Sequence, residues 1–203
     1  MDKKIKVWEV SLLIGLICAV VIGAWAQKSQ KELSDKLLRL HVVANSDTEV
    51  DQELKLSVRD RILEMSEPLI SEAKNSHEAA ETLISNLPEI VEQAQREVRA
   101  MGYNYNVSAE LRDESFPTRE YDGFSLPAGT YRALRVTIGE GGGENWWCVV
   151  FPPLCGQYGN INEAAKQAGL SDGEIALIAE SDGVKIKFRS IEIYERLRKF
   201  LSA

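Results

Sequence analysis

The chain has 203 residues, of which 44% are hydrophobic, and a formal net charge of −7 at pH 7. An acidic chain without clustered Lys and Arg is not suited to nucleic acid or an anionic membrane surface as its main partner. Its length and apolar content are sufficient for one domain with a substantial core.

The first 26 residues differ from the rest of the chain. Three lysines near the N-terminus precede an uncharged, mostly apolar run from Val10 to Ala26, which is the pattern of an export signal. Ala24-Trp25-Ala26 fits a small-x-small cleavage site, so we expect cleavage between Ala26 and Gln27. The run is 17 residues long, close to the ~20 that span a bilayer, so the alternative is an uncleaved membrane anchor. Both interpretations place the body of the protein outside the cytoplasm.

Residues 27–36 are polar and charged, and we expect a linker or a helical lead-in there. A single domain should then cover residues 37–203. Its first element combines a strand, a turn and the start of a helix. Apolar residues alternate with Arg39 and His41 from residue 38 to 44, which predicts a buried strand. Asn45-Ser46-Asp47 favours a turn, and Ser46 with Glu49 fits a capping box.

Two helical regions are expected next. In the first, Val50, Leu54, Val58 and Ile62 form an apolar stripe, which leaves Asp51, Lys55 and Arg59 on an exposed face, and Pro68 is a plausible end. The second covers residues 76–101. Pro88 should kink or divide it, with a capped restart at Asn86, and Gly102 should end it.

From residue 103 the apolar period changes to two, which predicts strands. One strand covers residues 105–111, and residues 113–129 look irregular, with a short strand near 118–121. Residues 131–138 and 145–151 resemble a hairpin around the glycine-rich loop 139–144. The second arm is apolar on both faces, so we expect it at the centre of the sheet.

Short helices should follow at residues 160–168 and after a capping box of Ser171 and Glu174, then a strand at 184–188 and a last helix near 193–201. Strands and helices do not alternate regularly. The expected fold class is therefore α+β, with a mixed, mostly antiparallel sheet packed against helices.

Catalytic or metal chemistry finds little support in the sequence. With only two histidines in the chain, the one nucleophile–base pair to consider is Cys148 with His41, as in an exported hydrolase or thiol enzyme. Cys148 lies in the most apolar stretch, where a cysteine is usually inert. A disulfide between Cys148 and Cys155 and two separate thiols both remain open, because spacing alone does not establish the Cα separation.

The acidic residues near position 50 and the glycine-rich loop also have structural explanations. Carboxylates at 47, 49, 51 and 53 crowd a helix N-terminus, where negative charge is favourable, and a calcium loop would need a glycine that is absent. The loop 139–144 lacks the Lys-Ser/Thr of a phosphate-binding loop and has two glutamates. We therefore predict no catalytic residues, no metal and no cofactor.

Two long blocks resemble a known family. Residues 38–47, continued through Asp51-Gln52-Glu53-Leu54-Lys55 and Val58-Arg59-Asp60, resemble stage II sporulation protein R, and so do residues 131–139 with 145–155. The order of export segment, first block, helical stretch and second block is also similar. Gly156 departs from the bulky residue expected after Cys155, and residues 157–183 contribute nothing to the resemblance.

The resemblance implies a sporulation signal rather than an enzyme. Members of that family are exported from the forespore into the space between the two septal membranes. There they activate a membrane-embedded aspartic protease of the mother cell, which processes pro-sigma-E. The partner would thus be this protease, without a small-molecule substrate. Candidate partner contacts in the two blocks are His41, Asn45, Asp47, Asp51, Lys55, Arg59, Trp146 and Trp147.

Overall fold

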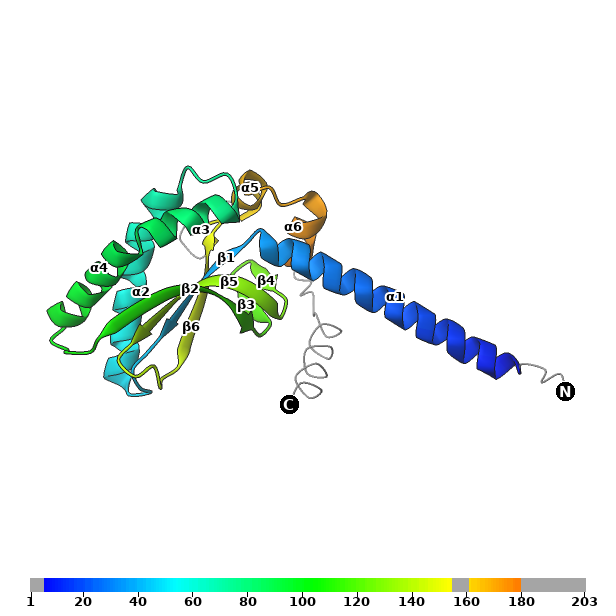
Figure 1. Ribbon diagram of the computed structural model, residues 1–203, viewed down its shortest axis with the longest axis horizontal. Helices are drawn as coiled ribbons and strands as arrows, with labels where there is room; N and C mark the ends of the chain where they lie inside the picture. Colours follow the sequence, from blue (N-terminus) through cyan, green and yellow to red (C-terminus); the bar gives the residue numbers. More distant parts are fainter. Residues whose placement is uncertain (1–5, 155–160, 180–203) are drawn as a thin grey trace.

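The computed structural model describes residues 6–154 and 161–179 and shows an α+β domain preceded by a long helix (Figure 1). The elements in chain order are α1 (Val7–Asp35), β1 (Leu38–Val43), α2 (Glu49–Ile70), α3 (Ser76–Ser85), α4 (Leu87–Ala100), β2 (Val107–Phe116), β3 (Arg119–Tyr121), β4 (Phe124–Leu126), β5 (Gly129–Ile138), β6 (Asn145–Phe151), α5 (Ile161–Gln167) and α6 (Asp172–Ile178).

The main sheet has the strand order β2-β5-β1-β6. β1 is parallel to β5 and antiparallel to β6, and β2 is antiparallel to β5. The sheet is therefore mixed and mostly antiparallel, as predicted. The predicted hairpin of β5 and β6 is wrong, because β1 is inserted between them. Every residue of β1 is buried, which fits an interior strand, whereas β6 begins with one exposed and two half-buried residues and lies at the end of the described order rather than at the centre.

One face of the sheet carries the helix layer of α2, α3 and α4 (Figure 1). Leu54, Val58 and Ile62 of α2 are fully buried in the core with the apolar side chains of β1. Val50, the first residue of the predicted stripe, is 51% exposed. It lies in the first turn of α2, at the end of the helix where the chain arrives from the sheet.

The boundaries of the helices correct several details. α2 begins with Thr48 as its N-cap, not with the predicted Ser46–Glu49 box, and it continues past Pro68 to Ile70. The second helical region is divided into α3 and α4 at Asn86, as Pro88 predicts, although the Asn86 side chain bonds back to Thr82 instead of capping α4. Gly102 ends α4 with a φ of 88°, a conformation that glycine adopts without strain.

The remaining elements confirm the sequence pattern in part. β2 extends to Phe116, five residues beyond the predicted end, and the predicted short strand is β3. The sequence analysis missed β4, which pairs with β3. α5 and the Ser171–Glu174 capping box of α6 are as predicted. The predicted last strand and last helix lie outside the described residues.

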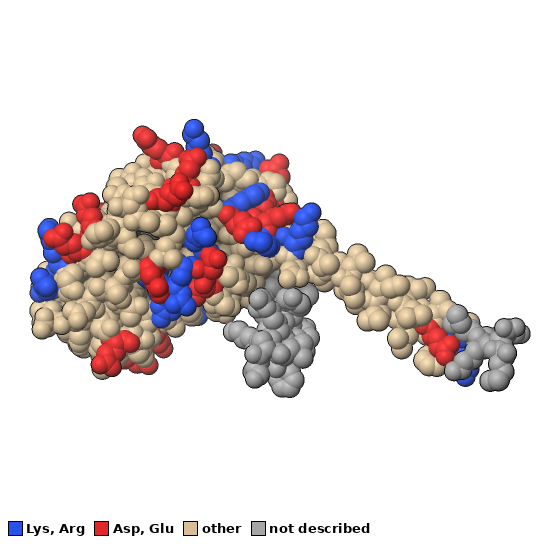
Figure 2. All heavy atoms as spheres, viewed as in Figure 1, with Lys and Arg blue, Asp and Glu red and all other residues tan. Residues whose placement is uncertain are grey.

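α1 extends away from the domain as a rod (Figure 1), and Figure 2 shows most of its surface without charged side chains. Within the described residues it is the one helix long and apolar enough to cross a membrane. Its apolar residues before Ala26 are exposed, whereas Leu33 and Ser34 near its C-terminal end are buried against the domain. An ion pair of 2.6 Å between Lys36 Nζ and Glu174 Oε2 joins the following turn to α6. α1 is thus compatible with a signal or an anchor segment.

Candidate interaction site

The two blocks singled out in the sequence meet in the sheet. β1 belongs to the first block, and its neighbours on either side, β5 and β6, belong to the second. Side chains alternate between the two faces of a strand, so β1 contributes to both faces. Leu40 and Val42 point toward the helix layer, whereas Arg39 and His41 point to the opposite side. We call this side the outer face of the sheet.

The turn after β1 holds the glycine-rich loop 139–144. Backbone N–H groups of Gly142 and Gly143 donate to the carbonyl oxygens of Asn45 and Ala44 at 3.1 and 3.0 Å. Two side chains of the turn add to this: Asn45 Oδ1 accepts from the Glu140 amide at 3.1 Å, and Asp47 Oδ1 accepts from the Glu144 amide at 2.6 Å. The loop is therefore not a free hairpin loop. We call this arrangement of residues 44–47 with 139–144 the loop clasp.

Asp51 of α2 stabilises the loop clasp through hydrogen bonds to the turn after β1. Its side chain is 2% exposed, and Oδ2 accepts hydrogen bonds from Asn45 Nδ2 at 2.9 Å and Ser46 Oγ at 2.6 Å. Burial alone would raise the pKa of this carboxyl, but the hydrogen bonds from Ser46 and Asn45 outweigh it and hold the pKa below its ordinary value. Asp51 is a structural carboxylate, so the prediction that it is exposed is wrong.

Lys55 is also buried, at 5% exposure, and its Nζ donates to the Glu144 carbonyl at 3.1 Å. Burial lowers the pKa of Lys55, and the charges of Glu144 and Asp47 oppose that change. The helix face of Asp51, Lys55 and Arg59 was predicted to be exposed. It instead faces the loop clasp and β6, because the loop 139–144 folds over the start of α2.

The tight contact within the loop clasp explains a glycine. A Cβ on Gly143 would lie 2.3 Å from the backbone oxygen of Ser46, and a backbone atom cannot rotate away. We expect Gly143→Ala to reduce the free energy of unfolding by about 2 kcal/mol, as overpacking does elsewhere. Gly173→Ala, where a Cβ would meet no atom within 4 Å, is the control in urea denaturation. Equal stability of the two variants would contradict the close approach.

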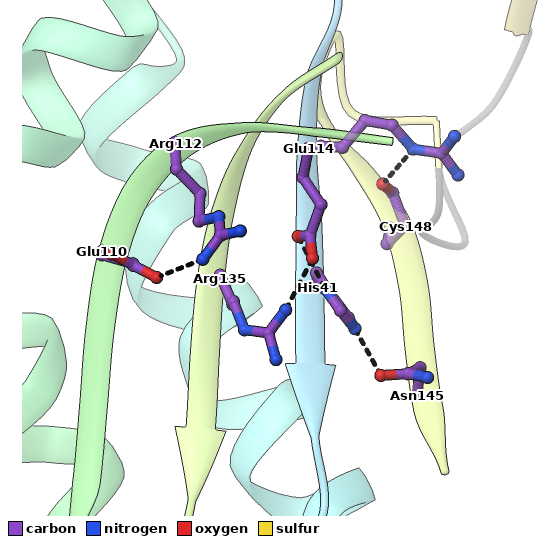
Figure 3. A network of polar contacts seen from close by, with 8 residues as sticks. His41, Glu110, Arg112, Glu114, Arg135, Asn145 and Cys148 are labelled. Carbon is purple, nitrogen blue, oxygen red and sulfur yellow. Dashed lines mark hydrogen bonds and ion pairs between the residues drawn. The ribbon is translucent and has the colours of Figure 1, made fainter. Parts of the chain in front are cut away.

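A second polar cluster lies on the outer face (Figure 3). His41 is 4% exposed, and its Nδ1 is 2.8 Å from Glu114 Oε2 while its Nε2 is 2.6 Å from Asn145 Oδ1. The other carboxylate oxygen, Oε1, accepts from Arg135 Nη1 at 2.6 Å. Four strands thus contribute one residue each: β2, β5, β1 and β6. Both ring nitrogens of His41 therefore have a hydrogen-bond partner.

Glu114 is the central acceptor of this cluster. Partial burial raises its pKa, but the hydrogen bond and charge of His41, together with the charge of Arg135, outweigh burial and hold the pKa below its ordinary value. Its neighbours Glu110 and Arg112 on β2 are exposed and form a separate pair at 3.0 Å (Figure 3).

The two tryptophans of β6 lie on opposite faces, as the strand alternation predicts, and both are partly buried. Each is covered by a guanidinium group. Arg59 of α2 lies over Trp146 with 4.7 Å between Cζ and the ring centroid. On the outer face, Arg119 of β3 lies over Trp147 at 3.8 Å.

Arg39 lies within a cluster of aromatic side chains, which no pattern in the sequence indicated. It is fully buried, with Cζ 4.0 Å from the Phe116 ring centroid and 5.0 Å from that of Tyr131. Its guanidinium donates to the Tyr121 hydroxyl and to the Cys148 carbonyl. Burial raises the pKa of Tyr131 to about 12, so this hydroxyl remains protonated and donates to the Pro127 carbonyl at 2.7 Å.

The structure does not bring His41 and Cys148 together. His41 pairs with Trp147 across the β1–β6 ladder and Cys148 pairs with Leu40, so the imidazole and the sulfur lie on opposite faces. Neither ring nitrogen contacts a hydroxyl or thiol in the part of the chain that the structure describes, which a nucleophile activated by His41 would need. Cys148 is disulfide-bonded. The pairing with Cys155 stays a prediction, because Cys155 lies outside the described residues.

Metal binding has no support in residues 6–154 and 161–179, where no group of three potential ligands could hold an ion.

The predicted partner contacts fall into two groups. His41, Asp51 and Lys55 are buried supports, whereas Asp47 is exposed and Asn45, Arg59, Trp146 and Trp147 are partly exposed.

Comparison with known proteins identifies the family. Residues 34–160 match the family described as stage II sporulation protein R. Stage II sporulation protein R of Bacillus subtilis (strain 168) is 36% identical over 159 residues, which cover 77% of this chain and 71% of that protein. No solved structure matches the chain. The match spans β1, the loop clasp and the outer-face cluster, which is formed by His41, Glu114, Arg135 and Asn145. The chain belongs to the stage II sporulation protein R family.

Proposed function

We propose that this sporulation protein is an exported signal that activates the membrane-embedded aspartic protease of the mother cell, which processes pro-sigma-E. The observation that carries the proposal is the family membership. It is supported by a folded domain that follows an exposed apolar helix. Such a helix suits a protein that acts in the space between the forespore and mother-cell membranes, either released after Ala26 or anchored by residues 10–26.

The domain would act by binding rather than by chemistry. It would contact the extracytoplasmic surface of the protease and stabilise its active, dimeric state, because a ligand shifts an equilibrium toward the state that it binds more tightly. Asn45, Asp47, Arg59, Trp146 and Trp147 are at least partly exposed and are the predicted contacts that remain available for this role. Tryptophan and arginine are also the residues that most often anchor interfaces.

The proposal predicts activation in a purified system. The full chain, added to vesicles that hold the protease and pro-sigma-E, should cause cleavage of the pro-sequence without any other forespore protein. Cleavage is followed by gel electrophoresis over time. Vesicles with a protease that lacks its catalytic aspartates are the control. Absence of cleavage in the presence of folded protein and active protease would contradict the proposal.

A further inference from the structure

Arg119 differs from Arg112 and Arg135, which also lie on the outer face, in its lack of a counter-ion among the described residues. Arg112 is paired with Glu110 and Arg135 with Glu114. The Arg119 guanidinium lies flat against Trp147, and its Nε is buried without a hydrogen-bond partner. It forms no ion pair with a carboxylate in residues 6–154 or 161–179. A partly desolvated guanidinium without an acceptor is unfavourable, since burying a charge requires a partner to compensate.

A second guanidinium, that of Arg39, also has no carboxylate partner among the described residues. Arg39 is 0% exposed, and its Nη1 has no hydrogen-bond partner. It contacts a tyrosine hydroxyl, a backbone carbonyl and the faces of aromatic rings, none of which carries a formal charge. Burial lowers the pKa of Arg39, and the charge of Arg119 lowers it further, so the two cations repel each other. The chain is acidic overall, yet neither of these two guanidinium groups forms an ion pair within the described residues.

The side chains around Arg119 hold it in place. Trp147 packs against His41 at 5.7 Å and Phe116 at 6.4 Å between ring centroids. His41 is itself fixed by Glu114 and Asn145. The buried cluster of the outer face therefore acts as a support that fixes the indole ring and, through it, the guanidinium. A preorganised donor loses less conformational entropy on binding.

We propose that Arg119, stacked on Trp147, binds a carboxylate side chain in an acidic extracytoplasmic segment of the protein partner. This inference rests on the proposed function and specifies the chemistry of its contact. A guanidinium presents several N–H donors in a planar fork that matches a carboxylate, and such charge-assisted hydrogen bonds are among the strongest in proteins. The positive charge of Arg39 behind the site strengthens the attraction for an anion.

A peptide titration tests the site without the protease. The full chain in detergent micelles, labelled with ¹⁵N, is titrated with a peptide of alternating glycine and glutamate, and the Arg119 Nε and Trp147 indole signals are followed by NMR. We expect saturable shifts of both signals, and none with the matched glycine–glutamine peptide. Loss of the Trp147 indole response in Arg119→Gln, and its retention in Arg96→Gln, would support the site. Arg96 lies on α4 in the helix layer and is exposed. No response to the glutamate peptide, or equal responses to both peptides, would overturn the inference.

The same variants separate the inference from the proposed function in the vesicle assay. Arg119→Gln should reduce the rate of pro-sequence cleavage at limiting protein by at least about tenfold, which corresponds to ~1.4 kcal/mol of binding. Arg119→Lys should keep part of the activity, since it retains the charge but not the planar fork. Wild-type activity in Arg119→Gln would overturn the carboxylate contact and leave the proposed function intact. Thermal unfolding confirms that each variant is folded.

Discussion

Asp51→Ala is expected to reduce the free energy of unfolding by about 3 kcal/mol, because hydrogen bonds to a charged acceptor contribute roughly 1.5–3 kcal/mol and two half-buried donors would lose theirs. The two donors are Asn45 Nδ2 and Ser46 Oγ. Asn45 also bonds to the loop 139–144 within the loop clasp, so this loop should open more readily in Asp51→Ala than in the wild type. Urea denaturation measures the first effect, and faster hydrogen exchange of the Gly142 and Gly143 amides measures the second.

Glu49→Ala is the matched control for Asp51→Ala. Both carboxylates lie in the first turn of α2, where negative charge is favourable, but Glu49 is exposed. Its replacement should change the stability by no more than about 0.5 kcal/mol. Equal effects of the two substitutions would mean that only the helix N-terminus matters and not the loop clasp. Because Asp51 is buried, a loss of signalling in Asp51→Ala would report on folding and not on a direct contact with the partner.

Glu114→Ala is the second large effect that we expect, with a loss of about 3 kcal/mol, since the buried His41 and the half-buried Arg135 would both lose their hydrogen-bond acceptor. His41 and Arg135 would both lose their carboxylate. Glu110→Ala, on the same strand, removes an exposed carboxylate and should be nearly neutral. If Glu114→Ala is as stable as Glu110→Ala, the outer-face cluster does not stabilise the fold.

The acid sensitivity of the protein should depend on the same residue. The pKa of Glu114 is lower in the folded protein than its ordinary value, so its ionised form stabilises the fold at higher pH. This contribution is lost as the pH falls below the ordinary glutamate pKa of about 4.3 and through the depressed folded value. Glu114→Gln should therefore lose less stability than the wild type over that range, as measured by thermal unfolding between neutral and acidic pH. An equal loss of thermal stability with falling pH in the wild type and in Glu114→Gln would contradict this assignment.

Local sequence patterns were sufficient for most helices and several strands. The alternation around Arg39 and His41 predicts β1, and Pro88 and Gly102 mark the division and the end of the second helical region. These signals depend on backbone geometry and on hydrogen bonds within a few residues, which the local sequence specifies. The apolar N-terminal segment is recognisable for the same reason, since it depends on composition alone.

The sheet order and the two polar clusters depended on the tertiary structure. Residues of the loop 139–144 and of β5 and β6 follow one another in the sequence, so a hairpin was the natural expectation, but β1 pairs with both strands and is buried along its whole length between them. That insertion brings His41 beside Glu114, Arg135 and Asn145. Glu114 and Asn145 are 73 and 104 positions away from His41 in the sequence, and Arg135 lies on the neighbouring strand β5, where it bonds to Glu114. No local pattern encodes such a register.

The same reasoning explains the errors about exposure. Asp51 and Lys55 lie off the apolar stripe of α2, and polar residues in that position usually face water. Here the loop 139–144 covers them, and their charges are compensated by groups that are distant in the sequence. The sequence by itself determined most of the local elements, the apolar N-terminal segment and the family resemblance. The tertiary structure decided which of the polar residues support the fold and which, like Arg119 on Trp147, have no counter-ion among the described residues, because burial and charge compensation are set by non-local packing.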